Sequence, residues 1–489
     1  YFHLLLRADD EGFLQNAKSI IRLIKCGEDD MKLLIAKQFI IPFESGVIVI
    51  KHWKIHNYIA RDRLTTTQCT KERGLLTENT NKEYELKNTS KIKDKKISDF
   101  KIEIQHIVPP ITSDYSGACS TLYGENILKI LISPNGCKTP VAYDEIRNID
   151  CSLQYSTSLN ELEIVTGEIK GLKDNIKEII SQNPKIELIA IISTVVPQII
   201  GMDLESIVEN IEETLDIPCI FINTNSFENY YSGISLTLKS LAKKFMVKNK
   251  KIKNTVNIIG YSPLTFGKIE KLEELFSLIK SLDLNILTVF SDNLSLEKIK
   301  NSTSAELNLV LSYEGLALAK YMEKEFSIPY VIINVVSKYG IENTENILKR
   351  FFYKIDNSFE KLEKRDKLDD RKVMIIASPF MAINIADSLR KDFSFDNILA
   401  LSLIKESRKF KKIEYLEFLN IVNTEEDLKE KIKEYKPDIL ISDPVYKNLV
   451  NEEITFIPLL HYGYSTRLYL ELDYEYCGKK AYEYFKKFI

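Results

Sequence analysis

In the larger, C-terminal part of the chain, short apolar runs of strand length recur, and most are followed by a stretch with helical periodicity. The run Leu188–Ile192 precedes an amphipathic stretch at Leu204–Leu215, and Val256–Gly260 precedes another at Ile269–Leu282. Continuous runs of Ile, Val and Leu are typical of strands that are buried on both faces. Strands that alternate with helices form parallel, doubly wound sheets. The pattern therefore predicts an α/β fold.

This alternation continues to the C-terminus, where further strand-length runs are Cys219–Ile222, Ile286–Phe290, Leu307–Leu311, Tyr330–Asn334, Val373–Ala377 and Asp438–Ile441. Charged breaks near 251–255 and 363–371 divide it into three Rossmann-like units, expected at residues 100–252, 253–368 and 369–489. Ligands of open α/β sheets bind at the carboxyl ends of strands. We therefore expect sites in the loops after Ile192, Gly260, Phe290, Leu311, Asn334 and Ala377. No Gly-x-Gly-x-x-Gly or Walker A string follows these strands, so a nucleotide site has no support.

Composition excludes several classes of protein. The net charge of −3 gives no global field for nucleic acid or membranes, and no apolar run of about 18 residues predicts a transmembrane helix. The chain has seven cysteines, an odd number, and they are widely spaced. Small secreted domains instead have closely spaced cysteines that pair in disulfides. A reducing cytoplasm fits this usage better. There, each scattered cysteine is either a small buried apolar residue or a metal ligand.

The first 65 residues have a different pattern. Two helical stretches, Leu14–Cys26 and Asp29–Gln38, precede two β-rich runs that flank Glu44-Ser45-Gly46. Helix, helix and hairpin together predict a winged-helix domain at 1–65, with Lys51–His56 on the wing. Residues 66–99 are polar and lack sustained apolar periodicity, which predicts a poorly packed linker. We expect few contacts between this domain and the rest of the chain.

Several strings in this region, among them Phe2–Leu5, Ala8–Phe13 and Val49–Tyr58, resemble the N-terminal domain of phage replisome organiser proteins over about residues 1–85. The resemblance implies DNA as a partner, with the second helix toward the groove and the wing on phosphate. The candidate DNA-binding residues are Lys32, Lys37, Lys51 and Lys54. The alternative is that these lysines form an ordinary solvated surface and that Trp53 is a core residue.

From about residue 100 onward, several motifs resemble the nitrogenase component 1 type family in the family's own order. The segments that carry the resemblance are Pro109–Ser120, Ser133–Cys137, Tyr155–Gly167, Thr194–Asp203, Leu307–Tyr313, Ile328–Tyr330 and Lys436–Ser442. The resemblance implies a fold of three Rossmann-like doubly wound parallel-sheet units. It also implies an oxidoreductase subunit that accepts electrons from an iron-protein-like ATPase reductase.

The resemblance further implies an iron–sulfur cluster at a subunit interface. Cys119 and Cys137 match two of the family's three cluster cysteines, whereas the third falls at Val196, which cannot bind metal. A [4Fe–4S] cluster takes four thiolates. A homodimer, or a pair with a related component 1 subunit, would bring four cysteines together. This arrangement predicts that Cys119 and Cys137 lie close together on loops, and that Tyr115 and Val196 are exposed in a lone chain.

Two further positions bear on the chemistry. The cysteine that anchors the catalytic cofactor of nitrogenase falls at Ser312, and no histidine follows His461 to supply the second cofactor ligand. We therefore expect no molybdenum–iron cofactor, and we take Ser312 and His461 as candidate substrate contacts. Three functions remain open from the sequence: a nitrogenase-like reductase with an unknown substrate, a phage-type replication protein that binds DNA, and a metal-free relic of the family.

Overall fold

The computed structural model describes residues 1–15, 28–43, 45–57, 65–79, 81–86, 107–108, 111–138, 153–355, 369–404, 413–450, 453–463 and 474–489. The chain divides into two compact units, Tyr1–Ile102 and Glu103–Ile489. In the part that is described, no helix is both long enough and apolar enough to cross a membrane.

The first unit is built around a small antiparallel sheet with the strand order β1-β3-β2, made by Phe13–Leu14, Ile48–Ile50 and Ile40–Pro42. The predicted hairpin is therefore present as β2 and β3, with Ile40 opposite Ile50. The predicted second helix is present as α3, Glu28–Ala36. Most of the predicted first helix lies outside the described residues, so the assignment as a winged helix stays a prediction. A short helix, α1, spans Phe2–Leu5.

Two expectations about the first unit are wrong. Residues 51–56 do not extend the hairpin: they form a turn and the helix α4 (Trp53–His56), in which Trp53 is buried and donates to the Asp10 carbonyl at 2.9 Å. The described part of the expected linker is also folded, as α5 (Thr70–Gly74) and the hairpin β4–β5 (Leu76–Glu78, Tyr84–Leu86). Tyr84 is fully buried and its hydroxyl donates to the Glu11 carbonyl, so these residues complete the core of the unit.

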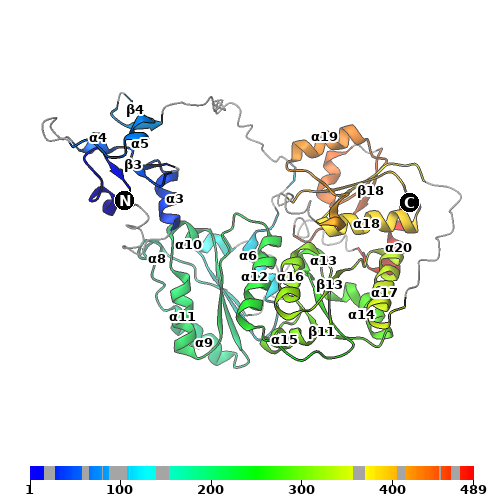
Figure 1. Ribbon diagram of the computed structural model, residues 1–489. Helices are drawn as coiled ribbons and strands as arrows, with labels where there is room; N and C mark the ends of the chain where they lie inside the picture. The colour runs from blue at the N-terminus through cyan, green and yellow to red at the C-terminus, as the bar shows by residue number, and fades with distance from the viewer. Residues whose placement is uncertain are drawn as a thin grey trace. The chain divides into compact units, whose positions relative to one another are not determined.

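In the second unit the first of three parallel sheets has the order β7-β6-β8-β9, from Gln154–Ser156, Ile127–Ile132, Leu188–Ser193 and Cys219–Ile222. Both faces of it are covered (Figure 1). Leu188, Ala190 and Ile192 pack in one apolar cluster with α6 (Asp114–Thr121) and α12 (Tyr230–Phe245). Ile189 and Ile191 face the other layer, formed by α9 (Leu172–Gln182) and α11 (Leu204–Leu215). Shorter helices follow β7 and β8: α8 (Glu161–Thr166) and α10 (Val195–Ile200).

The second sheet has the order β11-β10-β12-β13. Its strands are β10 (Thr255–Ile259), β11 (Asn285–Val289), β12 (Leu307–Val310) and β13 (Tyr330–Ile332). Its helices and helical turns are α13 (Pro263–Phe266), η4 (Ile269–Leu272), α14 (Glu273–Ser281), α15 (Leu296–Asn301), η5 (Ser302–Ser304), η6 (Tyr313–Gly315), α16 (Leu316–Phe326) and α17 (Ser337–Tyr353).

The third sheet has the order β16-β15-β14-β17-β18. Its strands are β14 (Val373–Ile376), β15 (Ile398–Ser402), β16 (Asn420–Ile421), β17 (Ile439–Ser442) and β18 (Thr455–Pro458). Its helices and helical turns are α18 (Pro379–Asp392), η9 (Glu414–Leu416), α19 (Glu425–Tyr435), η10 (Pro444–Leu449) and α20 (Gly478–Lys486). The predicted α/β class with parallel, doubly wound sheets is confirmed. The three sheets fall within the three expected ranges.

Candidate functional site

The helix that carries Cys119 is fixed at its first turn by a buried carboxylate. Asp114 accepts hydrogen bonds from the backbone N–H groups of Asn225 and Ser226 at 2.8 and 2.9 Å. Burial raises the pKa of Asp114, while these backbone donors act in the opposite direction. The bonds join the start of α6 to the loop that follows β9. They hold Cys119 at a defined place beside the first sheet.

Glycine allows α6 to approach α12 closely. A Cβ atom added to Gly117 would lie 2.1 Å from the Tyr230 carbonyl oxygen, and one added to Gly233 would lie 1.8 Å from the Asp114 carbonyl oxygen. No larger residue fits at either position without moving backbone. The helix with Cys119 and the helix with Tyr230 are therefore packed backbone to backbone.

Cys119 lies inside α6, with 3% of its surface exposed, and not on a loop as expected. Cys137 lies in the helical turn η2, Asn135–Lys138, which follows β6, but its side chain is outside what the structure describes. Val196 lies in α10, which follows β8, and is half-buried. Because β6 and β8 are parallel neighbours, with Ile132 opposite Ser193, η2 and α10 begin at the same edge of the sheet. The closeness of the two sulfurs remains a prediction.

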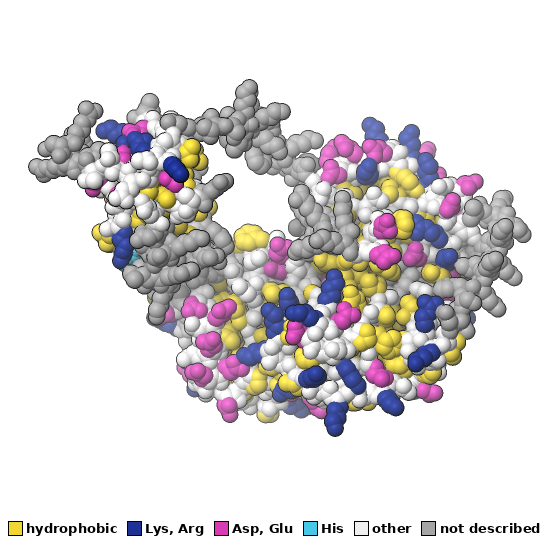
Figure 2. All heavy atoms as spheres, in the orientation of Figure 1, with side chains coloured by type: hydrophobic (Ala, Val, Ile, Leu, Met, Phe, Trp, Pro, Cys, Tyr) yellow, Lys and Arg dark blue, Asp and Glu magenta, His cyan; other side chains and the backbone are white. Residues whose placement is uncertain are grey.

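Apolar side chains are exposed at this carboxyl edge of the first sheet. Val165 of α8 is 83% exposed, Ile199 of α10 is 70% exposed, and Phe227, after β9, is 74% exposed. Tyr115, by contrast, is 4% exposed, so the expectation that it is exposed is wrong: it belongs to the core that α6 forms with α12. On the face shown in Figure 2, acidic and basic side chains are interspersed over the described part of the second unit. The three exposed apolar side chains are thus the feature that marks this edge of the first sheet.

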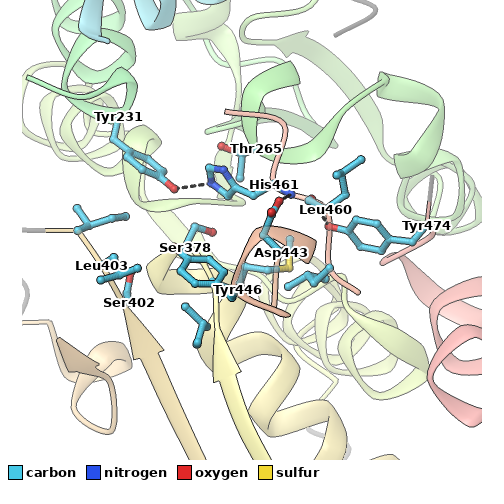
Figure 3. Close-up of a pocket in the computed structure, with 15 residues that line it drawn as sticks. Tyr231, Thr265, Ser378, Ser402, Leu403, Asp443, Tyr446, Leu460, His461 and Tyr474 are labelled. Carbon is cyan, nitrogen blue, oxygen red and sulfur yellow. Dashed lines mark hydrogen bonds between the residues drawn. The ribbon is translucent and has the colours of Figure 1, made fainter. Parts of the chain in front are cut away.

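A small pocket opens at the carboxyl ends of β14, β15, β17 and β18, with a cavity volume of about 30 Å³. His461 lies on its wall, three residues after the end of β18. Its backbone N–H donates to Asp443 at 2.7 Å, and its Nε2 atom lies 2.9 Å from the Tyr231 hydroxyl. Figure 3 shows these two rings pointing toward each other, with Ser378 and Tyr446 below them in the view. The pocket is lined by Tyr231, Thr265, Ile376, Ala377, Ser378, Met381, Ser402, Leu403, Ile404, Asp443, Tyr446, Leu459, Leu460, His461 and Tyr474.

The lining combines an apolar floor with a few polar groups, which is the usual character of a small-molecule site. Ser378 precedes the first turn of α18 and makes no capping bond with that helix. The Ser402 hydroxyl is buried and has no hydrogen-bond partner within the described part of the chain. The loop after Ala377 was expected to hold ligand contacts, and it does line this pocket.

Ser312 is buried, and its hydroxyl donates to the Gly260 carbonyl at 2.6 Å. Gly260 has a φ of +89°, and a Cβ atom there would lie 2.7 Å from the Ser312 oxygen. Ser312 does not line the pocket with His461, so the structure does not bring the two candidate substrate contacts together. Between them lie Glu314, Thr265 and Tyr230, which sequence reasoning missed. The rule that ligands lie beyond strand ends selects the loops after Gly260 and Leu311, but it does not select side chains within them.

Two of the four candidate DNA-binding lysines contact acidic or amide side chains of the first unit. Lys51 donates to Gln38 at 2.8 Å and lies 4.0 Å from Glu83, and Lys54 pairs with Glu78 at 2.5 Å. Lys37 is exposed, and the side chain of Lys32 lies outside the described residues. Trp53 is a core residue, as the alternative interpretation held. Within the described residues, no group of three or more His, Cys, Asp and Glu side chains has the geometry of a metal site.

Comparison with known proteins connects this architecture to a family. The chain is 27% identical over 263 residues to the nitrogenase iron-molybdenum cofactor biosynthesis protein NifE of Clostridium pasteurianum, covering 48% of this chain and 55% of that protein. It is 26% identical over 273 residues to one subunit of the light-independent protochlorophyllide reductase of Crocosphaera subtropica, covering 53% of each. The chain therefore spans about half the length of these curated relatives.

A solved structure of nitrogenase Cp1 at pH 6.5 has the same fold. The TM-score is 0.60 at 18% sequence identity, and the superposition covers 80% of this chain and 94% of that one. The sequence pattern of the nitrogenase component 1 type oxidoreductases matches residues 114–476, which begin at the helix of Cys119 and extend past the pocket. This protein belongs to the nitrogenase component 1 type oxidoreductase family.

Proposed function

We propose that this chain is a component 1 subunit of a nitrogenase-like reductase. In this proposal it holds an iron–sulfur cluster with Cys119 and Cys137, receives electrons from an iron-protein-like ATPase, and reduces a substrate in the pocket beside His461. The observation that carries the proposal is the family match over residues 114–476, which includes both cysteines and the pocket. The substrate itself is not specified by the lining residues.

The position of Cys137 supports a cluster at a subunit interface. Its turn, η2, starts at the sheet edge that exposes Val165, Ile199 and Phe227, whereas Cys119 is 3% exposed in the single chain and would have to become accessible to the cluster. Exposed apolar groups of this kind are typical of surfaces that bind another protein. Two thiolates per chain fit half of a [4Fe–4S] cluster, so a two-fold interface supplies the full set. Such a cluster would serve as a one-electron carrier.

The residue at position 312 supports a reductase without a molybdenum–iron cofactor. Ser312 offers a hydroxyl in place of the cofactor thiolate of nitrogenase, and this hydroxyl is already bonded to the Gly260 carbonyl. The pocket at the third sheet lies among hydroxyl groups and one imidazole instead. We therefore propose that substrate is reduced directly by electrons from the interface cluster.

The test is anaerobic purification followed by analysis of iron and acid-labile sulfide. Cys137→Ser should abolish bound iron and shift the protein from dimer to monomer in size-exclusion chromatography. Cys219→Ser is the matched control, because burial raises the pKa of the Cys219 thiol to about 12 and its strand lies in the core. A metal-free wild-type protein would favour a relic of the family. A Cys137→Ser protein with full iron and an unchanged elution volume would refute the ligand assignment.

A further inference from the structure

A continuous chain of hydrogen bonds leads from a buried carboxyl group to the pocket. Thr265 Oγ1 lies 2.7 Å from Glu314 Oε1, and the Tyr230 hydroxyl lies 3.0 Å from Thr265 Oγ1. The same hydroxyl lies 3.0 Å from His461 Nε2, which is also 2.9 Å from the Tyr231 hydroxyl. Each distance is within the range of a hydrogen bond. Figure 3 shows the pocket end of this chain, where Tyr231, Thr265 and His461 meet.

The residues of this hydrogen-bond chain are shielded from bulk water. Glu314 is 1% exposed, Tyr230 is fully buried, and Thr265 is 4% exposed. Burial is the largest influence on Glu314 and raises the pKa of its carboxyl group, while its contacts with the hydroxyls of Ser312 and Thr265 act in the opposite direction. No ion pair of Glu314 with a basic side chain is present in the described part of the chain. The uncharged acid is therefore the form that burial favours.

The direction of the bonds depends on where Glu314 carries its proton. With the proton on Oε1, Glu314 donates to Thr265, Thr265 donates to Tyr230, and Tyr230 donates to His461 Nε2. When Glu314 is ionised it accepts from Thr265, and the order reverses, so that an Nε2–H group of His461 donates to Tyr230. Glu314 and His461 thus share one proton through two hydroxyl groups.

We propose that Glu314 is a proton donor to the pocket, acting through Thr265 and Tyr230 on His461. In one transfer the O–H bond of Glu314 breaks and its proton passes to Thr265 Oγ1. Thr265 gives its own proton to Tyr230, and Tyr230 gives its own to His461 Nε2. The products are a Glu314 carboxylate and a His461 imidazolium, with both hydroxyl groups restored. His461 then takes up a proton from hydronium in the open pocket, and the reverse steps through Tyr230 and Thr265 return a proton to Glu314.

This inference rests on the proposed function in one respect: the proton is needed because the proposed reduction consumes protons together with electrons. The hydrogen-bond chain itself does not depend on that function. His461 and Tyr231 line the pocket and are placed to pass a proton to a bound substrate. Glu314 does not line the pocket, so its role is exerted through the two hydroxyl groups. The mechanism therefore makes a prediction about His461 that needs neither substrate nor iron.

Other polar and titratable groups lie near the two ends of the hydrogen-bond chain and can also affect the titration of His461 or Glu314. At His461 these are the Asp443 carboxylate, which accepts the backbone N–H of His461, and the phenols of Tyr446 and Tyr474 on the pocket wall. At Glu314 they are the hydroxyls of Ser312, near the carboxyl group, and Ser235, which donates to the Glu314 carbonyl at 2.9 Å. None of these groups is altered by the variants below.

The experiment is nuclear magnetic resonance of the full chain with ¹⁵N-labelled histidine. The sequence has five histidines, so His461→Gln identifies the signals of His461 by their loss. The ¹⁵N shifts of the ring report which nitrogen carries the proton, and the relay requires Nε2 to accept a hydrogen bond from Tyr230 before the transfer. Glu314→Gln should shift the titration midpoint of His461 by up to about one pH unit, the scale on which two titrating sites count as interacting. In a Thr265→Val background, the same Glu314→Gln change should produce a clearly smaller shift, because only the through-space electrostatic effect remains.

Tyr230→Phe breaks the chain at a second point and should give the same result as Thr265→Val. Thr344→Val is the matched control, because the Thr344 hydroxyl is equally buried but donates to the Asn334 carbonyl and has no part in the chain. It should leave the signals of His461 unchanged. An unchanged midpoint in Glu314→Gln, or an equal shift when the chain is broken, would overturn the relay. Iron content is measured separately, so failure of the relay and failure of the proposed function are distinguishable.

Discussion

Substitution of Gly233 by alanine should disrupt the contact on which the candidate site is built. The added Cβ atom would lie 1.8 Å from the Asp114 carbonyl oxygen, and side-chain carbons do not approach backbone oxygen closer than about 3.0 Å. The two helices must therefore separate by about 1.2 Å. The Asp114 carboxylate bonds to the backbone of Asn225 and Ser226 cannot follow that movement without stretching.

The expected loss of stability has two contributions, the overpacking at position 233 and the weakened hydrogen bonds of Asp114. Overpacking of a core costs about 1–3 kcal/mol. Weakening one hydrogen bond to a charged group costs about 1.5–3 kcal/mol more. We expect a loss of about 3–5 kcal/mol in the free energy of unfolding of the second unit, which corresponds to a fall of about 1 M or more in the urea midpoint.

The assay uses a property of the sequence. Trp53 is the sole tryptophan of the chain and lies in the first unit, so its fluorescence reports unfolding of residues 1–102. Far-UV circular dichroism is dominated by the larger second unit. Gly233→Ala should lower the midpoint from circular dichroism and leave the tryptophan transition unchanged. Gly136→Ala is the control, because a Cβ atom there meets no atom within 4 Å. Equal midpoints for the two variants would refute the argument from close packing.

Three further outcomes are expected. Burial raises the pKa of Glu314 above its usual 4.5, so ionisation of this group lowers the stability of the folded protein as the pH rises above that value. In urea titrations at several pH values, Glu314→Gln should therefore gain stability relative to wild type with rising pH. A difference that stays constant with pH would contradict this. Tyr84→Ala should destabilise the first unit by about 3–5 kcal/mol, read from Trp53 fluorescence, because Tyr84 is fully buried there; a change below about 1 kcal/mol would restore the linker interpretation. Phe227→Glu should shift the elution volume from that of a dimer to that of a monomer. Thermal stability should not fall, because this side chain is 74% exposed in the single chain. An unchanged elution volume would exclude this edge as the interface.

Local sequence was sufficient to predict the architecture of the second unit. Leu188–Ser193 is buried along its whole length, as a continuous apolar run requires of a central parallel strand. Helix α11 has the predicted bounds, Leu204–Leu215, and Asp203 caps it by accepting from the Ser206 N–H. Periodicity and capping are properties of neighbouring residues, so one sequence is enough to show them. The motif order around Cys119 and Cys137 was likewise sufficient to indicate the family.

Tertiary packing determined which side chains are buried outside the regular patterns and which distant side chains meet. Tyr84 lies in a polar segment with no apolar period, yet its ring is buried because its hydroxyl reaches Glu11, 73 positions earlier. Tyr115 is buried because glycines let α6 and α12 meet. The Tyr230 hydroxyl reaches His461 across 231 positions of sequence. Contacts of this kind depend on how whole helices and sheets pack, and no local pattern encodes which side chains then meet. The sequence by itself therefore determined the fold and the family, whereas only the folded chain brought Glu314, Thr265, Tyr230 and His461 into one line of hydrogen bonds.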